Sequence, residues 1–170
     1  AAVPGVLPGD YYAIVRADIF NTLSEGVGEA NNAQASSGFL HVSLNDLQLG
    51  VPALGALAAN QRHYYQLNAG PDHTVRITLD SQAVSGANEV YVRFGDIPDL
   101  VHYDYVFQQP FNPDQELIIP TTETGTYYVL VRGNYVPGGA APFSLLAEIV
   151  PLTLDDITPD EGGDTGLVTT

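Results

Sequence analysis

Oxygen-bearing side chains gather in one short stretch near the N-terminus. They are Asp18, Asn21, Glu25, Glu29, Asn31 and Asn32. Calcium takes roughly six to eight oxygen ligands, which carboxylates, amide side chains and backbone carbonyls of a loop can supply. The stretch is therefore a candidate calcium site. Asp and Asn are also frequent in turns, because they tolerate left-handed backbone and cap nearby backbone groups. We favour the turn interpretation and keep calcium as the alternative.

Tyrosines form a second group that could recognise a ligand. Side chains alternate between the two faces of a strand, so in each Tyr-Tyr pair one ring points inward and one outward. An outward set is a candidate surface for a sugar or a collagen-like matrix, and its candidate residues are Tyr65, Tyr91, Tyr103 and Tyr128. More often such rings form cross-strand pairs that stabilise the sheet, and we favour that interpretation. The absence of Trp counts against a typical carbohydrate platform.

Catalytic motifs are missing from the sequence. It contains no G-x-S-x-G, no H-E-x-x-H and no Cys, so a nucleophile elbow, a zinc-protease helix and thiol chemistry are excluded. The four histidines are scattered, and none is four residues from another: His41, His63, His73 and His102. We predict that the chain is not an enzyme.

Charge and composition exclude further classes. Twenty acidic residues against five arginines and no lysine give a net charge of -15, so the basic footprint that nucleic-acid binding requires is absent. No apolar run reaches the roughly 20 residues of a membrane helix, and no membrane span is predicted. A hydrophobic content of 45% argues against disorder. The lack of Met and of a signal peptide indicates a piece of a longer exported protein.

Apolar and polar residues alternate with period two along most of the chain, which predicts strands. The expected strands cover residues 11–19, 38–44, 62–67, 74–79, 89–94, 103–107, 116–119, 126–132 and 143–150. Many short strands with regular turn signals predict an all-β fold. We expect a jelly-roll-like β-sandwich, preceded by a β-hairpin and followed by an extended acidic strand or tail. Residues 50–60 carry Pro52 and Gly55 and are expected to be a linker that packs along the sandwich.

Three family resemblances assign consecutive parts of this pattern to known domains. Residues 8–32 (PGDYYAIVRADIFNTLSEGVGEANN) resemble the closing hairpin of CARDB, a cell-adhesion-related domain of surface proteins. Residues 53–150 resemble the bacterial pre-peptidase C-terminal (PPC) domain, with Tyr64-Tyr65, NEVYVRFG at 88–95 and GTYYVLVRG at 125–133 as landmarks. The tail, with Thr158-Pro159 and Gly162-Gly163, is similar to the first strand of an Ig-like IPT/TIG repeat.

The resemblances imply four segments. Residues 1–46 are expected to be the CARDB-like hairpin, 47–61 a linker, 62–150 the PPC-like sandwich, and 151–170 an acidic tail or the first strand of an Ig-like repeat. Such modules imply a non-catalytic structural or adhesion role, outside the cell or at its surface. Neighbouring domains or identical subunits are the expected partners, and assembly head to tail by strand addition is one possibility. The alternative is a calcium-stabilised module that binds polysaccharide or a collagen-like matrix protein.

Overall fold

The computed structural model describes residues 5–20, 22–24, 26, 28 and 32–151. Its strands, in chain order, are β1 (Gly9–Tyr11), β2 (Ile14–Arg16), β3 (Ala33–Ala35), β4 (Leu40–Val42), β5 (Asn45–Asp46), β6 (Ala53–Leu57), β7 (Arg62–Ala69), β8 (Val75–Ser81), β9 (Ala87–Phe94), β10 (Tyr105–Phe107), β11 (Gln115–Ile119), β12 (Gly125–Tyr135) and β13 (Ala141–Ile149). These described residues include no α-helix. The prediction of an all-β fold is confirmed, and the predicted acidic tail from residue 152 onward lies outside the described residues.

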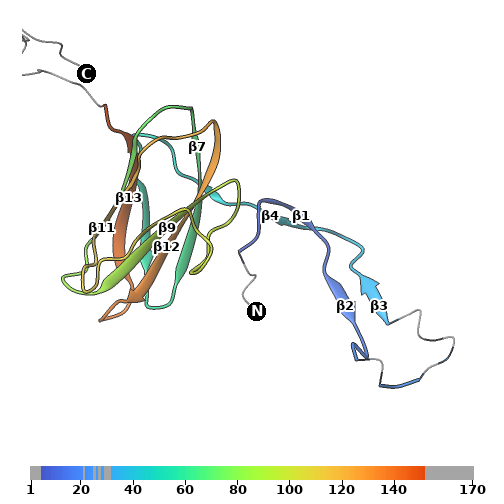
Figure 1. The fold of residues 1–170 in the computed structure, drawn as a ribbon. Coiled ribbons are helices and arrows are strands. Elements are labelled where there is room, and N and C mark those ends of the chain that lie inside the picture. Colours follow the sequence, from blue (N-terminus) through green and yellow to red (C-terminus); the bar gives the residue numbers. More distant parts are fainter. Residues whose placement is uncertain (1–4, 21, 25, 27, 29–31, 152–170) are drawn as a thin grey trace, which may run out of the picture.

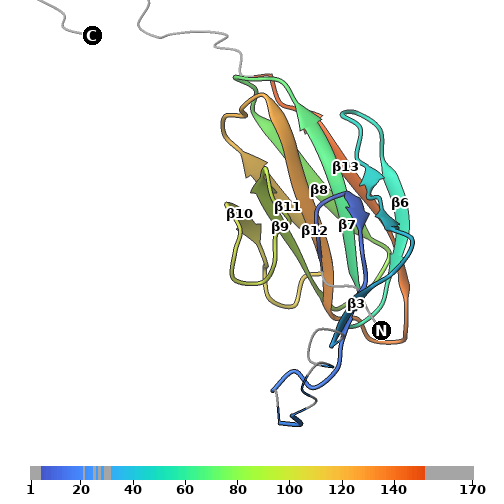
Figure 2. The same cartoon turned by 90° about the vertical axis from the view of Figure 1, so that its right-hand side faces the viewer.

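Two sheets form the sandwich (Figures 1 and 2). One has the strand order β10-β9-β12-β7-β5 and the other β11-β8-β13-β6. Pairing is antiparallel throughout, except that β5 runs parallel to β7. Strands that neighbour each other in a sheet are thus often distant in sequence, as in jelly-roll folds.

The core lies between the sheets and follows from the alternation. Val90 and Val92 on β9 pack with Ile77 and Leu79 on β8, and all four are fully buried in one cluster. The shorter β11 shows the same pattern, because Gln115, Leu117 and Ile119 are buried and the residues between them are exposed. Side chains from two inner faces that interdigitate in this way are the expected core of a β-sandwich.

Part of the segment 47–61, predicted as a linker, belongs to the sandwich itself. Leu47 is buried in the core, and Leu49 forms a parallel bridge with Ala147 of the other sheet. Residues 53–57 then form β6, which pairs with β13. The expectation that this segment packs along the sandwich is met, but it does so as a strand.

Gly55 explains why β6 is hard to find in the sequence. A Cβ at this position would lie 2.7 Å from the Phe143 ring of β13, so the ring occupies the space that a side chain would need. Glycine lowers strand propensity, and it often marks places where another group approaches the backbone closely. The short, glycine-containing β6 therefore lacks the β-branched signature by which the other strands were predicted.

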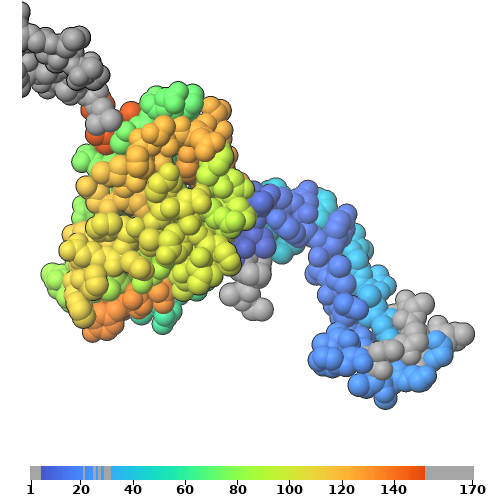
Figure 3. Space-filling model, in the orientation of Figure 1, coloured from blue at the N-terminus to red at the C-terminus, as the bar shows by residue number. Residues whose placement is uncertain are grey.

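The N-terminal hairpin forms a two-stranded arm that protrudes from the sandwich (Figures 1 and 3). β1 pairs with β4 beside the sandwich, and β2 pairs with β3 farther out. The single strand predicted over residues 11–19 is interrupted between Tyr11 and Ile14. The predicted hairpin is thus present, and both of its halves are short two-stranded ladders.

Candidate functional site

The arm exposes apolar side chains on both of its faces. Ile14 and Val15 are adjacent on β2 and so point to opposite faces, yet they are 66% and 72% exposed. Further large apolar side chains are exposed along the arm, namely Tyr12, Ile19, Phe20, Leu23, Phe39 and Leu40. Large apolar side chains that gather at a protein surface in this way mark an interaction site. The described residues also leave the outer edges of β2 and β3 unpaired.

Asp18 lies in the turn at the end of β2, and it belongs to the predicted calcium cluster. Its two carboxylate oxygens accept hydrogen bonds from the backbone N–H of Thr22 and of Leu23, both at 2.9 Å, and from the Thr22 hydroxyl. The bond from Leu23, followed by that from Thr22, holds the pKa of the Asp18 carboxyl below its usual value. Its φ of 38° lies in the left-handed region, which Asp tolerates. The geometry is that of a local turn cap.

Of the other five residues in the predicted cluster, only Asn32 is described. Its backbone carbonyl accepts a hydrogen bond from Ala17 at 2.9 Å, next to Asp18. The remaining four, Asn21, Glu25, Glu29 and Asn31, lie outside the described residues. Among the described residues, no group of three or more His, Asp or Glu side chains is placed to hold a metal ion. Calcium at this turn stays a prediction.

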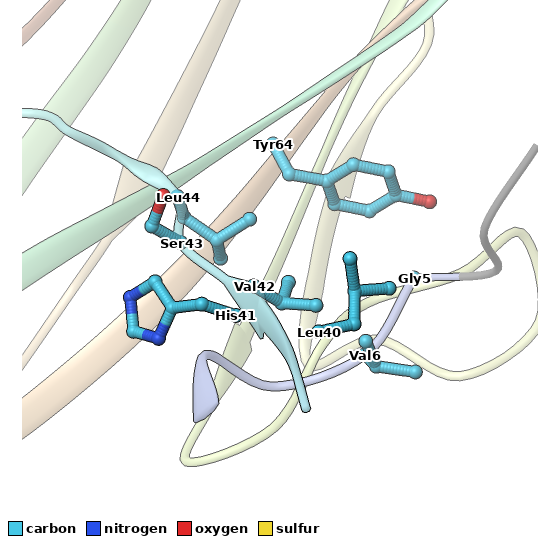
Figure 4. A pocket seen from close by; sticks show the side chains of 8 residues that line it. All are labelled: Gly5, Val6, Leu40, His41, Val42, Ser43, Leu44 and Tyr64. Atoms are coloured by element: carbon cyan, nitrogen blue, oxygen red, sulfur yellow. The ribbon is translucent and has the colours of Figure 1, made fainter. Parts of the chain in front are cut away.

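A pocket of about 360 Å³ lies where the arm joins the sandwich (Figure 4). Its lining is Gly5, Val6, Leu40, His41, Val42, Ser43, Leu44 and Tyr64. Leu40 and Val42 lie toward the Tyr64 ring of β7, whereas His41 points away from it. His41 instead contacts its cross-strand partner Asp10, with Nδ1 and Oδ1 2.7 Å apart. The lining is mainly apolar, so this pocket fits a packing joint better than a reaction centre.

Gly5 sets how closely the segment before β1 approaches the sandwich. A Cβ at Gly5 would lie 2.9 Å from Cγ2 of Ile97 and 3.1 Å from the Tyr64 hydroxyl oxygen. Ile97, in the loop between β9 and β10, is itself 8% exposed. The base of the arm therefore packs directly against the outer face of the five-stranded sheet.

The four predicted ligand-binding tyrosines do not form one surface. Tyr65 is buried within the core, and Tyr91 is only 3% exposed. Tyr91 does point away from the opposite sheet, but the loop between β9 and β10 brings Tyr103 over it, with ring centroids 5.4 Å apart. Tyr103 is 38% exposed and Tyr128 is half-buried. The expectation of an outward set fails for Tyr65 and Tyr91, because one lies between the sheets and the other under a loop.

A groove that the sequence did not reveal lies at the end of the sandwich where β9 begins. We name it the Phe111 groove. It has a volume of about 240 Å³ and is lined by Ala87, Asn88, Glu89, Gln108, Gln109, Pro110, Phe111, Asn134 and Tyr135. In the sequence, residues 109–113 (QPFNP) signal only a turn. The apolar residue at the centre of that turn was the one available sign that it presents an aromatic side chain.

One stretch of the sandwich is similar to a known protein family. Residues 61–133 match the bacterial pre-peptidase C-terminal domain. That domain is a non-catalytic module. The matched residues span β7 to most of β12, and β6 and β13 of the sandwich lie outside the match. The CARDB and Ig-like resemblances of the two ends stay predictions.

Three of the solved structures that are similar to this chain are the following. The pre-peptidase C-terminal domain of a Bacillus anthracis collagenase is 17% identical, with a TM-score of 0.49 over 62% of this chain and 94% of that one. PliG, a periplasmic inhibitor of g-type lysozyme, matches from Aeromonas hydrophila (16% identity, TM-score 0.44, 63% and 97% coverage). PliG from Salmonella Typhimurium also matches, with 14% identity and a TM-score of 0.38 over 62% of this chain and 99% of that one. No curated protein matches the chain significantly. No helix in the described part of the chain is long and apolar enough to cross a membrane.

Proposed function

We propose that the chain is a structural module of a large extracellular or surface-exposed bacterial protein, and that its arm joins it to a neighbouring subunit by strand addition. The observation that carries the proposal is the exposure of apolar side chains on both faces of the arm, with Ile14 at 66% and Val15 at 72%. A hairpin of two strands is marginal by itself in water. Burial of each such side chain contributes roughly 1.5–3 kcal/mol, so a covering partner is strongly favoured.

Strand addition suits this surface because the arm offers backbone groups as well as side chains. The outer edges of β2 and β3 are unpaired within the described chain, and an unpaired edge is a template for another strand. Arg16 at the end of β2 is exposed and is one of only five cationic side chains in the protein. An incoming strand with carboxylates beside its apolar residues would match the arm in both hydrophobicity and charge.

The segment from Leu152 to Ile157 (LTLDDI) has this composition, and it is the donor we propose. It lies outside the described residues, and its pattern of apolar, polar and acidic side chains supports the assignment. β13, which precedes it, ends on the side of the sandwich away from the arm (Figures 1 and 2). Because β13 ends away from the arm of its own copy, donation of the following segment to another copy would be a head-to-tail contact, and contacts of this kind that do not close form open filaments.

Light scattering coupled to size-exclusion chromatography tests this proposal. We expect the protein to exceed its monomer mass of 18.1 kDa, with the average mass rising with concentration. The double variant Ile14→Ser/Val15→Ser and the tail variant Leu152→Asp/Leu154→Asp should each run as monomers. Val84→Ser is the matched control, because Val84 is fully exposed on the sandwich. A wild-type monomer at every concentration, or an oligomer that all these variants retain, would overturn the proposal.

The same experiment tests calcium. Runs in millimolar calcium and in EDTA differ only if the turn at Asp18 or another acidic loop binds the ion in the assembled form. Loss of the large species in EDTA would support a calcium-dependent joint. Identical profiles in both buffers would remove calcium from the proposal and leave strand addition in place.

A further inference from the structure

The loop that carries Phe111 is held rigidly by a buried amide. Gln115, which is 2% exposed, accepts a hydrogen bond from the Gln109 backbone N–H at 2.9 Å. Its Nε2 donates to the carbonyl oxygens of Gln109 at 3.3 Å and of Asn112 at 2.7 Å. The Asn112 side chain also donates to the side chain of Gln109. These bonds close the loop on both sides of Phe111 and fix its conformation.

Phe111 itself is both strained and exposed. Its φ of 57° lies in the left-handed region, which is unfavourable for a bulky residue. Its side chain is 90% exposed, so burial within the sandwich does not offset the strain. Strained residues of this kind persist where the surroundings hold them, and they cluster at ligand-binding sites. The rigid loop therefore presents the Phe111 ring to solvent.

Tyr135 lines the same groove from β12 and is 59% exposed. The register of β12 against β9 shifts between Gly133 and Tyr135, and irregularities of this type often re-aim a side chain. Two aromatic side chains on separate segments thus border one groove. Aromatic rings of this kind offer flat apolar faces on which a ligand can stack.

The groove also has a polar floor with both a donor and an acceptor. Oε2 of Glu89 is occupied by Arg132 at 2.7 Å and by the Tyr91 hydroxyl at 2.8 Å. Within the described chain, no hydrogen bond involves Oε1 of Glu89 or Nε2 of Gln108. A carboxylate acceptor and an amide donor are therefore available in the same groove. Arg132 balances the charge of Glu89, so the floor carries little net charge.

We propose that the Phe111 groove binds one unit of a neutral saccharide. Neighbouring sugar hydroxyls can donate to a carboxylate and accept from an amide, while the apolar face of the sugar ring stacks on an aromatic side chain. The net charge of -15 disfavours acidic or sulfated glycans by repulsion. The volume of about 240 Å³ is below the usual range for drug-sized ligands, which fits a single ring better than a long buried chain.

NMR titration of the ¹⁵N-labelled protein with neutral sugars tests the proposal. The probes are oligomers of glucose, galactose, mannose and N-acetylglucosamine. We expect at least one of them to shift the backbone amide signals of the groove residues, namely Gln108, Gln109, Phe111, Asn112, Asn134 and Tyr135. Phe111→Ala and Tyr135→Ala should each weaken binding at least tenfold, whereas Tyr135→Phe should retain most of it. Val101→Ala is the matched control, because Val101 is 75% exposed and lies in the loop at the opposite end of β9.

Each other outcome decides against the groove as a saccharide site. If no neutral sugar shifts these signals, or if Phe111→Ala binds as well as wild type while circular dichroism shows it folded, the proposal fails. Binding of a proline-rich peptide in place of sugars would assign the groove to a protein partner and also overturn it. The test is independent of assembly, because the monomeric Ile14→Ser/Val15→Ser variant keeps the whole groove.

Discussion

Arg132 on β12 and Glu89 on β9 are direct cross-strand partners, and 2.7 Å separates Nη1 of the arginine from Oε2 of the glutamate. Their side chains are only 18% and 9% exposed, so solvent and salt screen this ion pair poorly. The Tyr91 hydroxyl donates to the same oxygen. The ion pair thus lies in a polar network at the inner end of the Phe111 groove.

Replacement of Arg132 by Met should be strongly destabilising. The buried Glu89 carboxylate would lose its cationic partner, and breaking a buried pair in this way costs roughly 3–5 kcal/mol. Because this pair is not fully buried, we expect a loss of about 3 kcal/mol in the free energy of urea unfolding. The double variant Glu89→Gln/Arg132→Met should recover more than half of that loss.

The pair formed by Arg76 and Glu148 supplies the control. Its shortest nitrogen–oxygen distance, from Nη2 of Arg76 to Oε1 of Glu148, is also 2.7 Å, but its side chains are 40% and 36% exposed. Exposed pairs contribute about 0–1 kcal/mol, so Arg76→Met should change stability by no more than that. Equal losses at Arg132 and Arg76 would show that burial does not determine the strength of these pairs.

The sequence predicted the sandwich where alternation was strong, as in β11 and β12, because a period of two and β-branched residues are local signals. It did not predict β6, since the close approach of the Phe143 ring to Gly55, which excludes a side chain there, is a tertiary property. It also placed Tyr91 at the surface, because strand alternation says which face a ring lies on, not what covers that face. The loop that carries Tyr103 over Tyr91 decides its burial. For the same reason, the Phe111 groove depends on contacts between Gln115 and a loop that local patterns cannot show.

Acid should release the loop at Asp99 before the sandwich unfolds. The Asp99 carboxylate accepts hydrogen bonds from the His102 ring at 2.9 Å and from the backbone N–H groups of Val101 and His102 at 2.7 Å. These bonds, that of the His102 side chain first, lower the pKa of Asp99 from 3.8 to about 2. Because the pKa of this carboxyl is lower in the folded loop than in the unfolded chain, its ionised form stabilises the folded loop at pH values above the unfolded pKa. This stabilisation is lost as the pH falls toward the folded pKa.

We therefore expect the amide signals of Val101 and His102 to stay folded-like above pH 3.8 and to change as the pH falls toward about 2. NMR of wild type and of Asp99→Asn measures this directly. The variant should show weaker loop order already at neutral pH and no transition in the acid range. An acid transition of equal size in Asp99→Asn would assign the effect to another carboxyl group.

Alkali should unfold the protein through its buried tyrosines. Burial raises the pKa of Tyr65, and burial followed by the hydrogen bond to Glu89 raises that of Tyr91, both from an ordinary value of 10.0. A raised pKa gives stability that is complete below the unfolded value and is lost as the pH rises above it. The free energy of urea unfolding should thus be flat near neutral pH and fall above pH 10.0.

Tyr91→Phe distinguishes this cause from general alkaline damage. The variant should lose about 1 kcal/mol at neutral pH, because its hydroxyl bond to Glu89 is gone. Above pH 10.0 its stability should fall less steeply than that of wild type. The variant has no hydroxyl at position 91 that could ionise in the unfolded chain and stay protonated in the folded one. Parallel curves for the two proteins would show that Tyr91 does not contribute to the alkaline transition.

Gly133 should tolerate no side chain, because it lies where β12 meets the turn between β6 and β7. A Cβ there would overlap the carbonyl oxygen of Ala58 and lie 3.0 Å from Val136. The backbone is also fixed, since the Gly133 carbonyl accepts from Asn60 at 2.6 Å and its N–H donates to Gln61 at 3.1 Å. Gly133→Ala should therefore destabilise the protein by about 1–3 kcal/mol, as overpacking does.

Gly38 offers a matched comparison on the arm. A Cβ at Gly38 would meet no atom within 4 Å, and its φ is outside the left-handed range. Gly38→Ala should therefore stay within about 0.5 kcal/mol of wild type in urea unfolding. If Gly133→Ala also stays within that range, the turn between β6 and β7 can move away from β12. In that case the pairing of β6 with β13 and the burial of Leu57 would hold β6 to the sandwich without the hydrogen bonds at Gly133.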